Sequence, residues 1–158
     1  MRRNQGVTII ELLVTISIAV ILMTIAAPGL QDFLRNNRVA GVTNAVTGFL
    51  HTARSEAVTR GSASTVCPDA DGNSTCDGST DWTGSLIVLV GGTVVKRLDN
   101  DPDVTLTSSA NSIVFDRKGA ASAATTVNAA KGTCPGRSEL QLSLTTTGRI
   151  TSSKIECP

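Results

Sequence analysis

Residues Gly6 to Pro28 read GVTIIELLVTISIAVILMTIAAP, and this stretch decides how the rest of the chain is organised. It carries one charge, Glu11, and no further charge follows before Asp32. The twenty uncharged residues from Leu12 to Gln31 are about the number that an α-helix needs to cross the ~30 Å hydrocarbon core of a bilayer. The hydroxyls that interrupt the run can bond to helix carbonyls, so they cost little in lipid. We therefore expect a membrane helix close to the N-terminus.

Glu11 is the unusual residue of this stretch. A carboxylate inside a membrane helix is costly and needs a partner, and the stretch contains no basic side chain. A free α-amino group on Val7 would supply the partner if the chain were cut after Gly6, and the pair could form between neighbouring subunits. Such a buried ion pair sets the register of the helices more than it adds stability.

The run Gly6-Val7-Thr8-Ile9-Ile10-Glu11 resembles the class III (prepilin) signal of type IV pilins and type II secretion pseudopilins. The resemblance implies that prepilin peptidase cuts between Gly6 and Val7 and methylates the new N-terminus at Val7, where the family usually has Phe. It also implies that the helix is held in the inner membrane until it packs into a filament core with other pilin or pseudopilin subunits. Pro28 matches a proline that the family often has at this depth, so Glu11 and Pro28 are the expected assembly residues.

Two simpler interpretations compete with this resemblance. An ordinary secretory signal has a shorter apolar run without a carboxylate, and the small residues Ala26 and Ala27 run into Pro28, which is poor for cleavage. A plain single-span anchor does not explain why Gly6 and Glu11 occur in this order. The sequence therefore favours a prepilin signal.

Length and charge define the remaining organisation. The 158 residues allow the anchor and one domain of ordinary size, and we expect a leader (1–6), a membrane or filament-core helix (7–30), its amphipathic continuation (31–60) and a globular β domain (61–158). Residues 61–115 carry seven acidic and two basic side chains, whereas residues 116–158 carry six basic and three acidic ones. The leader arginines stay cytoplasmic by the positive-inside rule, which places the β domain in the periplasm.

The four cysteines favour disulfides over a metal site. No C-x-x-C pair occurs and the chain has one histidine, so a zinc site is not expected. An even number of cysteines behind a membrane anchor indicates disulfides in an oxidising compartment. Of the three pairings that four cysteines allow, we favour Cys67–Cys76 with Cys134–Cys157. The first pair closes a short polar loop and the second ties the C-terminus to the domain.

Apolar residues continue at helical spacing from Phe33 to Ala57, which predicts one helix over roughly residues 8–60 that ends at Gly61. Its end, Ala53-Arg54-Ser55-Glu56-Ala57-Val58-Thr59-Arg60, resembles the family of H-type pseudopilins and minor pilins (GspH/FimT/FimU-like), in which a strand such as residues 62–67 follows. We interpret Arg54 and Glu56 as a solvated helix face.

Residues 68–84 consist of turn formers and acids, which predicts a loop. Asp69, Asp71 and Asn73 match the opening of a calcium loop, but the glutamate at its twelfth position is missing. We therefore favour a polar disulfide loop without a metal. Trp82 followed by Gly84 resembles the family's strand-entry motif, W-x-x-G, and Trp82 is expected to anchor the core and not to bind a ligand.

The rest of the chain predicts antiparallel strands. A hairpin is expected from two strands around Gly91-Gly92. Further strands are expected at 104–107, 112–115, 139–144 and after Gly148-Arg149, while the Ala/Ser/Thr-rich residues 120–131 are expected to form a surface loop. The predicted fold is α+β, with one long helix packed on an antiparallel β-sheet or sandwich domain, which is the pilin fold.

No catalytic or cofactor-binding pattern accompanies this fold. The single histidine, His51, has no assembled nucleophile or base beside it in sequence, and Gly91-Gly92 belongs to a hairpin and not to a phosphate loop. We therefore predict a protein that is not an enzyme and needs no cofactor, and whose one reaction is its own processing.

Two classes of function follow from the resemblance. The first is structural: a minor pilin of a type IV pilus that primes assembly at or near the tip, with the H pseudopilin of a type II secretion system as the alternative. The second is DNA binding for natural transformation, because some relatives use a basic G-R-x-R motif in a C-terminal loop. Here only Gly148-Arg149 remains, with Lys154 and Arg137 as further candidates, so DNA is not the favoured partner.

Overall fold

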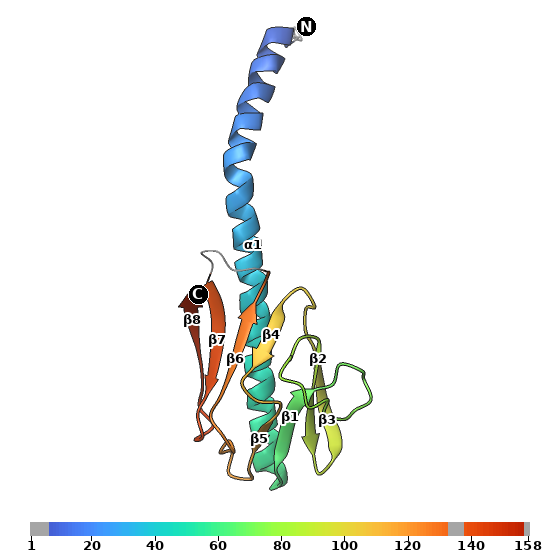
Figure 1. The fold of residues 1–158 in the computed structure, drawn as a ribbon. Helices are drawn as coiled ribbons and strands as arrows, with labels where there is room; N and C mark the ends of the chain where they lie inside the picture. The colour runs from blue at the N-terminus through green and yellow to red at the C-terminus, as the bar shows by residue number, and fades with distance from the viewer. Residues whose placement is uncertain (1–6, 133–137, 157–158) are drawn as a thin grey trace, which may run out of the picture. The chain divides into compact units, whose positions relative to one another are not determined.

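The computed structural model describes residues 7–132 and 138–156. The chain forms two compact units, residues 1–37 and residues 38–158. Helix α1 (Ile9–Arg60) contributes to both units, and the described part of the second unit adds eight strands (Figure 1). The strands are β1 (Ser64–Pro68), β2 (Ser85–Val90), β3 (Thr93–Asp99), β4 (Thr105–Ser108), β5 (Ile113–Phe115), β6 (Thr125–Ala130), β7 (Ser138–Leu144) and β8 (Ile150–Glu156).

The ends of α1 follow from local chemistry. Thr8 caps its start, because the Thr8 Oγ1 accepts a hydrogen bond from the Glu11 N–H at 3.3 Å and the Thr8 carbonyl accepts one from the Leu12 N–H at 3.2 Å. Gly61 ends the helix with a φ of +62°, which costs glycine little. The predicted long helix and its glycine stop are confirmed.

The strands form two antiparallel sheets, in the orders β3-β2-β1-β5 and β4-β6-β7-β8. The predicted hairpin is β2–β3, in which Ser85 lies opposite Asp99. Its turn residues Gly91 and Gly92 both have positive φ, as a tight two-residue hairpin turn requires. The α+β fold with an antiparallel β domain is therefore confirmed.

One apolar core holds the second unit together. From Val39 onward the predicted stripe of α1 is buried against both sheets, whereas Phe33 in the first unit is 62% exposed. Trp82 is fully buried and its indole N–H donates to the Ala110 carbonyl at 3.1 Å, which confirms it as a core anchor. The buried helix residues are Val39, Val42, Val46, Phe49, Leu50, Ala53 and Ala57.

The expected surface loop at residues 120–131 is wrong. Half of this segment is β6, an interior strand between β4 and β7. Thr125, Val127 and Ala129 point inward and are buried, and they alternate with half-exposed residues. The composition of the whole segment was misleading because its many Ala residues are of a type that is depleted in strands, whereas pairing with β4 and β7 determines the structure here.

The expected solvated position of Arg54 is also wrong. Arg54 is partly buried, and its guanidinium donates to the Gly148 carbonyl at 3.0 Å and to the Thr147 carbonyl at 3.3 Å. Gly119, in the turn after β5, also packs on the Arg54 side chain. Arg54 therefore ties α1 to one turn from each sheet. Glu56 pairs with Arg60 one helical turn later, at 2.6 Å.

The close packing of these two turns requires glycine at position 148. Gly148 is buried with a φ of +78°, and a Cβ placed there would lie 2.2 Å from the Gly119 carbonyl oxygen. The Ala121 N–H also donates to the Thr146 carbonyl at 2.9 Å across the same contact. The packing of the two turns thus explains why position 148 is glycine, without a role in ligand binding.

Replacing Gly148 tests this packing. We expect Gly148→Ala to lower the free energy of unfolding by on the order of 3 kcal/mol, because it adds both a steric clash and a strained backbone. Gly91→Ala is the matched control, since Gly91 has a φ of +59° but open space around it, and should cost only about 1 kcal/mol. Denaturant unfolding followed by circular dichroism measures both, and equal losses would contradict the account of the turn contact.

Candidate functional site

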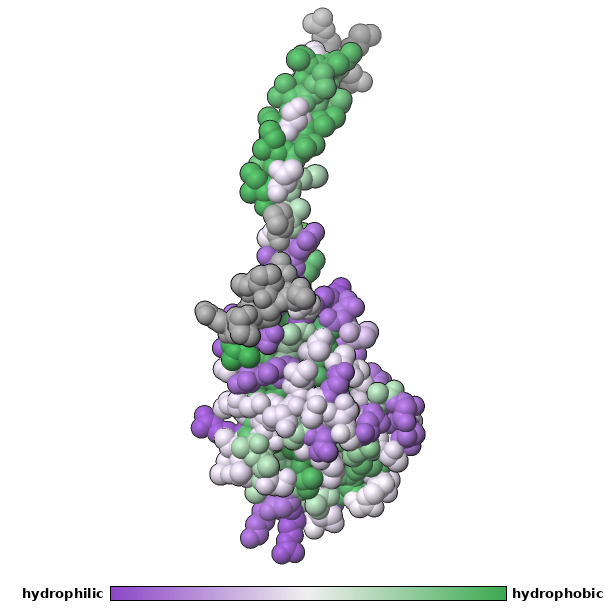
Figure 2. All heavy atoms as spheres, viewed as in Figure 1, coloured by the Kyte–Doolittle hydropathy of each residue, from purple (hydrophilic) through white to green (hydrophobic). Residues whose placement is uncertain are grey.

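The first part of α1 presents an uncovered apolar surface. In the first unit the large apolar side chains are half to four-fifths exposed, from Val14 at 50% to Ile9 at 82%. Figure 2 shows this part of the helix as a nearly continuous hydrophobic surface on the face in view. By length and composition this helix can cross a membrane, and its most apolar window is not buried at all within the described structure. An apolar surface of this size needs lipid or other helices around it.

The polar residues of this stretch are satisfied within the helix. Thr15, Ser17 and Thr24 donate their hydroxyl hydrogens to the carbonyls of Leu12, Leu13 and Ile21, at 2.7–2.9 Å. These bonds confirm the expectation that the hydroxyls cost little in an apolar environment. Pro28 lies within α1 and does not end it.

The predicted processing residues lie at the start of the helix. Gly6 is outside the described residues, whereas Val7 precedes the helix and is 71% exposed. Glu11 stands in the first turn, and Thr8 and Glu11 have the spacing of a capping box, in which a Glu side chain supports the helix start. The T-x-x-E spacing was missed in the sequence, and in the structure Glu11 takes part in the cap through its backbone N–H.

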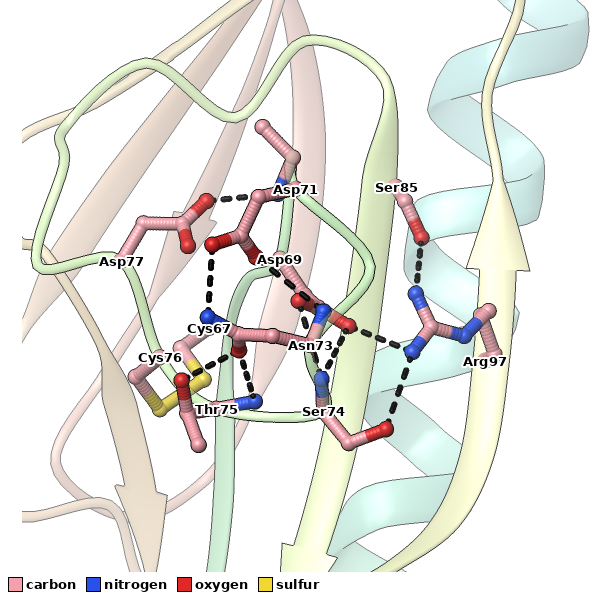
Figure 3. A network of polar contacts seen from close by, with 11 residues as sticks. Cys67, Asp69, Asp71, Asn73, Ser74, Thr75, Cys76, Asp77, Ser85 and Arg97 are labelled. Atoms are coloured by element: carbon pink, nitrogen blue, oxygen red, sulfur yellow. Dashed lines mark hydrogen bonds and ion pairs between the residues drawn. A yellow bond between two sulfur atoms is a disulfide. The ribbon is translucent and has the colours of Figure 1, made fainter.

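A disulfide closes the polar loop after β1 (Figure 3). Cys67 and Cys76 are bonded with an S–S distance of 2.02 Å and a Cα–Cα distance of 5.5 Å, which confirms the predicted pair. The second predicted pair, Cys134–Cys157, lies outside the described residues.

Asp69 is the centre of this loop. Its fully buried carboxylate forms an ion pair with the guanidinium of Arg97 from β3, and it accepts the Ser74 N–H at 3.2 Å. Arg97 also donates to Ser85 at 2.9 Å, so the loop is fixed to the β2–β3 hairpin (Figure 3).

The calcium pattern of the sequence falls within the same network. Oxygen atoms of Asp69, Asp71 and Asp77 lie within 4.8 Å of one another, and Asn73 bonds to Asp71 at 2.6 Å. Arg97 already balances the charge of Asp69, and Asp77 accepts the Ala70 N–H at 2.5 Å. These contacts indicate that the three carboxylates stabilise the fold of the loop.

The candidate DNA-binding residues do not form one cluster. Arg137 is outside the described residues, and Gly148 is buried. Arg149 and Lys154 are both exposed, but they are five positions apart along an extended chain, which separates them by about 16 Å. The turn before Arg149 packs instead, through Gly148, against the turn that carries Arg117 and Lys118. Sequence reasoning missed them because the contact between the two turns is not local.

A second set of charges joins the helix to the loops. Asp103 accepts hydrogen bonds from Arg38 of α1 at 3.0 Å and from Lys131 after β6 at 2.9 Å. The hydrogen bond and charge of Lys131, followed by the charge of Arg38, hold the pKa of Asp103 below its usual value. The single histidine, His51, is exposed on α1.

Comparison with known proteins finds two protein families that match this chain. The family described as "Type II transport protein GspH" matches residues 42–148, and the "Prokaryotic N-terminal methylation motif" matches residues 1–27. No curated protein matched the sequence.

Two crystal structures of the type IV minor pilin FimU from Pseudomonas aeruginosa (strain PAO1) share the fold. One has 21% sequence identity and a TM-score of 0.58, and the match covers 72% of this chain and 91% of that chain. The other has 20% identity and a TM-score of 0.60, with 77% and 92% covered. With its capped apolar helix, its helix-on-sheet core and the matched residues 42–148, this chain belongs to the GspH family of type IV pilin-like proteins.

Proposed function

We propose that this chain is a minor pilin of a type IV pilus. Prepilin peptidase cuts it between Gly6 and Val7 and methylates Val7. The subunit then waits in the inner membrane with its β domain in the periplasm, and it enters the filament at or near the tip, where it primes assembly beside other pilin subunits.

One observation carries the proposal: the apolar part of α1 is uncovered and carries a methylation motif at its start. Val7 is exposed just before the helix cap, where a membrane peptidase could reach the bond before it. In the membrane, lipid covers the apolar surface, and in a filament neighbouring helices replace the lipid. Glu11 and the new amine of Val7 would then fix the axial step between neighbours.

Two further observations support the proposed location. The leader arginines, Arg2 and Arg3, favour a cytoplasmic N-terminus. The Cys67–Cys76 disulfide of the β domain is typical of an oxidising compartment such as the periplasm.

The alternative is the H pseudopilin of a type II secretion system, which the description of the matched family favours. The two similar crystal structures come from a minor pilin, but at about a fifth sequence identity the likeness supports the shared fold alone. DNA binding receives less support, because Gly148 has a packing role and Arg149 and Lys154 lie apart.

The role of the Glu11 charge can be separated from its role at the helix start. Glu11→Gln removes the charge but keeps a side chain that can complete the capping box, whereas Glu11→Ala removes both. We expect both variants to remain in the membrane fraction and both to be lost from sheared filaments by about tenfold or more, because neither can pair with the Val7 amine. Immunoblots of the two fractions measure this.

Thr8→Ala is the matched control. It removes the cap that accepts the Glu11 N–H but leaves the Glu11 carboxylate, so we expect it to enter filaments nearly as well as the natural chain. If Glu11→Gln entered filaments normally, the charge pairing would be refuted and Glu11 would act through the helix start alone.

The second disulfide is the next prediction. Cys67 and Cys76 are bonded to each other, and Ser138 of β7 lies opposite Glu156 of β8, so Cys134 and Cys157 each lie within a few residues of this paired end. We expect one Cys134–Cys157 bond, and its removal should lower the free energy of unfolding by about 3 kcal/mol, as for a loop of this size.

Peptide mapping by mass spectrometry without reduction tests the pairing. The peptide pair that contains Cys67–Cys76 serves as the internal control in the same digest. Alkylation of Cys134 or Cys157 before any reduction would show that these thiols are free and would reject the predicted bond.

A further inference from the structure

Two groups of exposed charged side chains of the second unit lie near opposite ends of β1. The strand begins at Ser64, shortly after Arg60 ends α1, and it finishes at Pro68, directly before Asp69. Five residues of extended chain, about 16 Å, separate these ends. Part of the acidic middle of the sequence and part of its basic last third therefore lie near different ends of this strand.

The first end is basic, and we define it by four exposed side chains: Arg60, Arg117, Lys118 and Arg149. Phe115 lies opposite Ser64, so the turn that carries Arg117 and Lys118 follows β5 at the start of β1. The turn before Arg149 packs against that turn through Gly119 and Gly148.

Two acids at the basic end have partners of their own. Glu56 pairs with Arg60. Asp116 accepts the N–H groups of Lys118 at 2.8 Å and Ala120 at 2.9 Å. The Ala120 and Lys118 hydrogen bonds hold the pKa of Asp116 below its usual value, so this carboxylate stays charged and bound to its own turn. Arg117, Lys118 and Arg149 form no ion pair within the described residues and give this end a positive surface.

The second end is acidic, and we define it by three exposed carboxylates: Asp71, Asp77 and Asp99. The Asp69 N–H donates to the Ser85 carbonyl at 3.0 Å, and Ser85 lies opposite Asp99, so the loop and the end of β3 are neighbours. Asp69 and Arg97 neutralise each other. In the described part of the chain, no basic side chain pairs with any of the three exposed carboxylates.

This arrangement determines which contacts between copies are favourable. A two-fold contact through either end would bring like charges together, which is unfavourable. A head-to-tail contact brings the basic end of one copy to the acidic end of the next, and such heterologous contacts repeat along an open assembly.

We propose that the basic end is a docking surface for the acidic end of a second copy of this chain. The inference rests on the proposed function, because it gives the β domains of an assembling filament a contact of their own. Single-stranded DNA fits the surface less well. The aromatic side chains of the second unit, Phe49, Trp82 and Phe115, are all buried and cannot stack on bases.

Two sets of charge reversals test the contact in the full chain. The first set is Arg117→Glu, Lys118→Glu and Arg149→Glu, which makes both ends acidic. The second set is Asp71→Lys, Asp77→Lys and Asp99→Lys, which makes both ends basic. Lys154→Glu reverses an exposed charge on β8 that belongs to neither set and serves as the control for Arg149→Glu alone.

Two differently tagged copies of each chain are co-expressed, and their co-purification is measured after extraction of the membranes at low salt. We expect each set to pair with itself about tenfold less than the natural chain does, and we expect the two sets to pair with each other. Salt at about 1 M, where the screening length is about 3 Å, should abolish the differences. Lys154→Glu should pair normally, and Arg149→Glu should pair more weakly.

The rescue of pairing between the two sets separates docking from misfolding, because a misfolded variant would not recover with either partner. Equal yields in all pairings would show that the copies associate through their helices and would overturn the proposal. So would unchanged pairing of the first set together with lost retention of duplex DNA, which would identify a polyanion site. Absence of the natural chain from sheared filaments, with charge-dependent pairing in membranes intact, would overturn the proposed function and leave the docking surface standing.

Discussion

An apolar helix surface that the protein itself does not cover is the constraint on which the rest of the structure depends. The first part of α1 exposes Ile, Leu and Val side chains on every side, and burial of such surface is worth about 25 cal/mol per Å². Water is therefore an unfavourable environment for this part of the helix. The same helix becomes amphipathic from Val39 onward, where its buried stripe forms part of the core of the β domain. Helix α1 thus contributes both an apolar surface suited to lipid or other helices and a buried stripe in the core of the β domain.

Within that domain, long-range polar contacts position the surface features. Arg54 joins the helix to a turn from each sheet, one that precedes Arg149 and one that carries Arg117. Asp69 and Arg97, together with the Cys67–Cys76 bond, fix the acidic loop to the β2–β3 hairpin. Both anchors use a charge whose partner lies far away in sequence. These internal contacts therefore position the charged residues of the basic end and of the acidic end.

The sequence predicted those features that depend on local chemistry. The apolar run, the glycine stop at Gly61 and the nine-residue spacing of Cys67 and Cys76 were each readable from neighbouring residues. The strand at 125–130 was missed because its small residues gain their stability from neighbours that only the fold supplies. Arg54 was misjudged for the same reason, since its carbonyl partners lie more than ninety residues away. The packing of the turn before Arg149 against the turn of Arg117 and Lys118 was missed for the same reason.

The account requires that the uncovered helix begin at a new amine on Val7, four residues before Glu11. The mass of the mature chain, measured on protein purified from the membranes of its own host, tests this most directly. We predict a chain that lacks residues 1–6 and carries one methyl group on Val7. A product that keeps Met1, or one that is cut after Ala26 or Ala27, would contradict the account and leave a β domain with a membrane anchor or a secreted β domain.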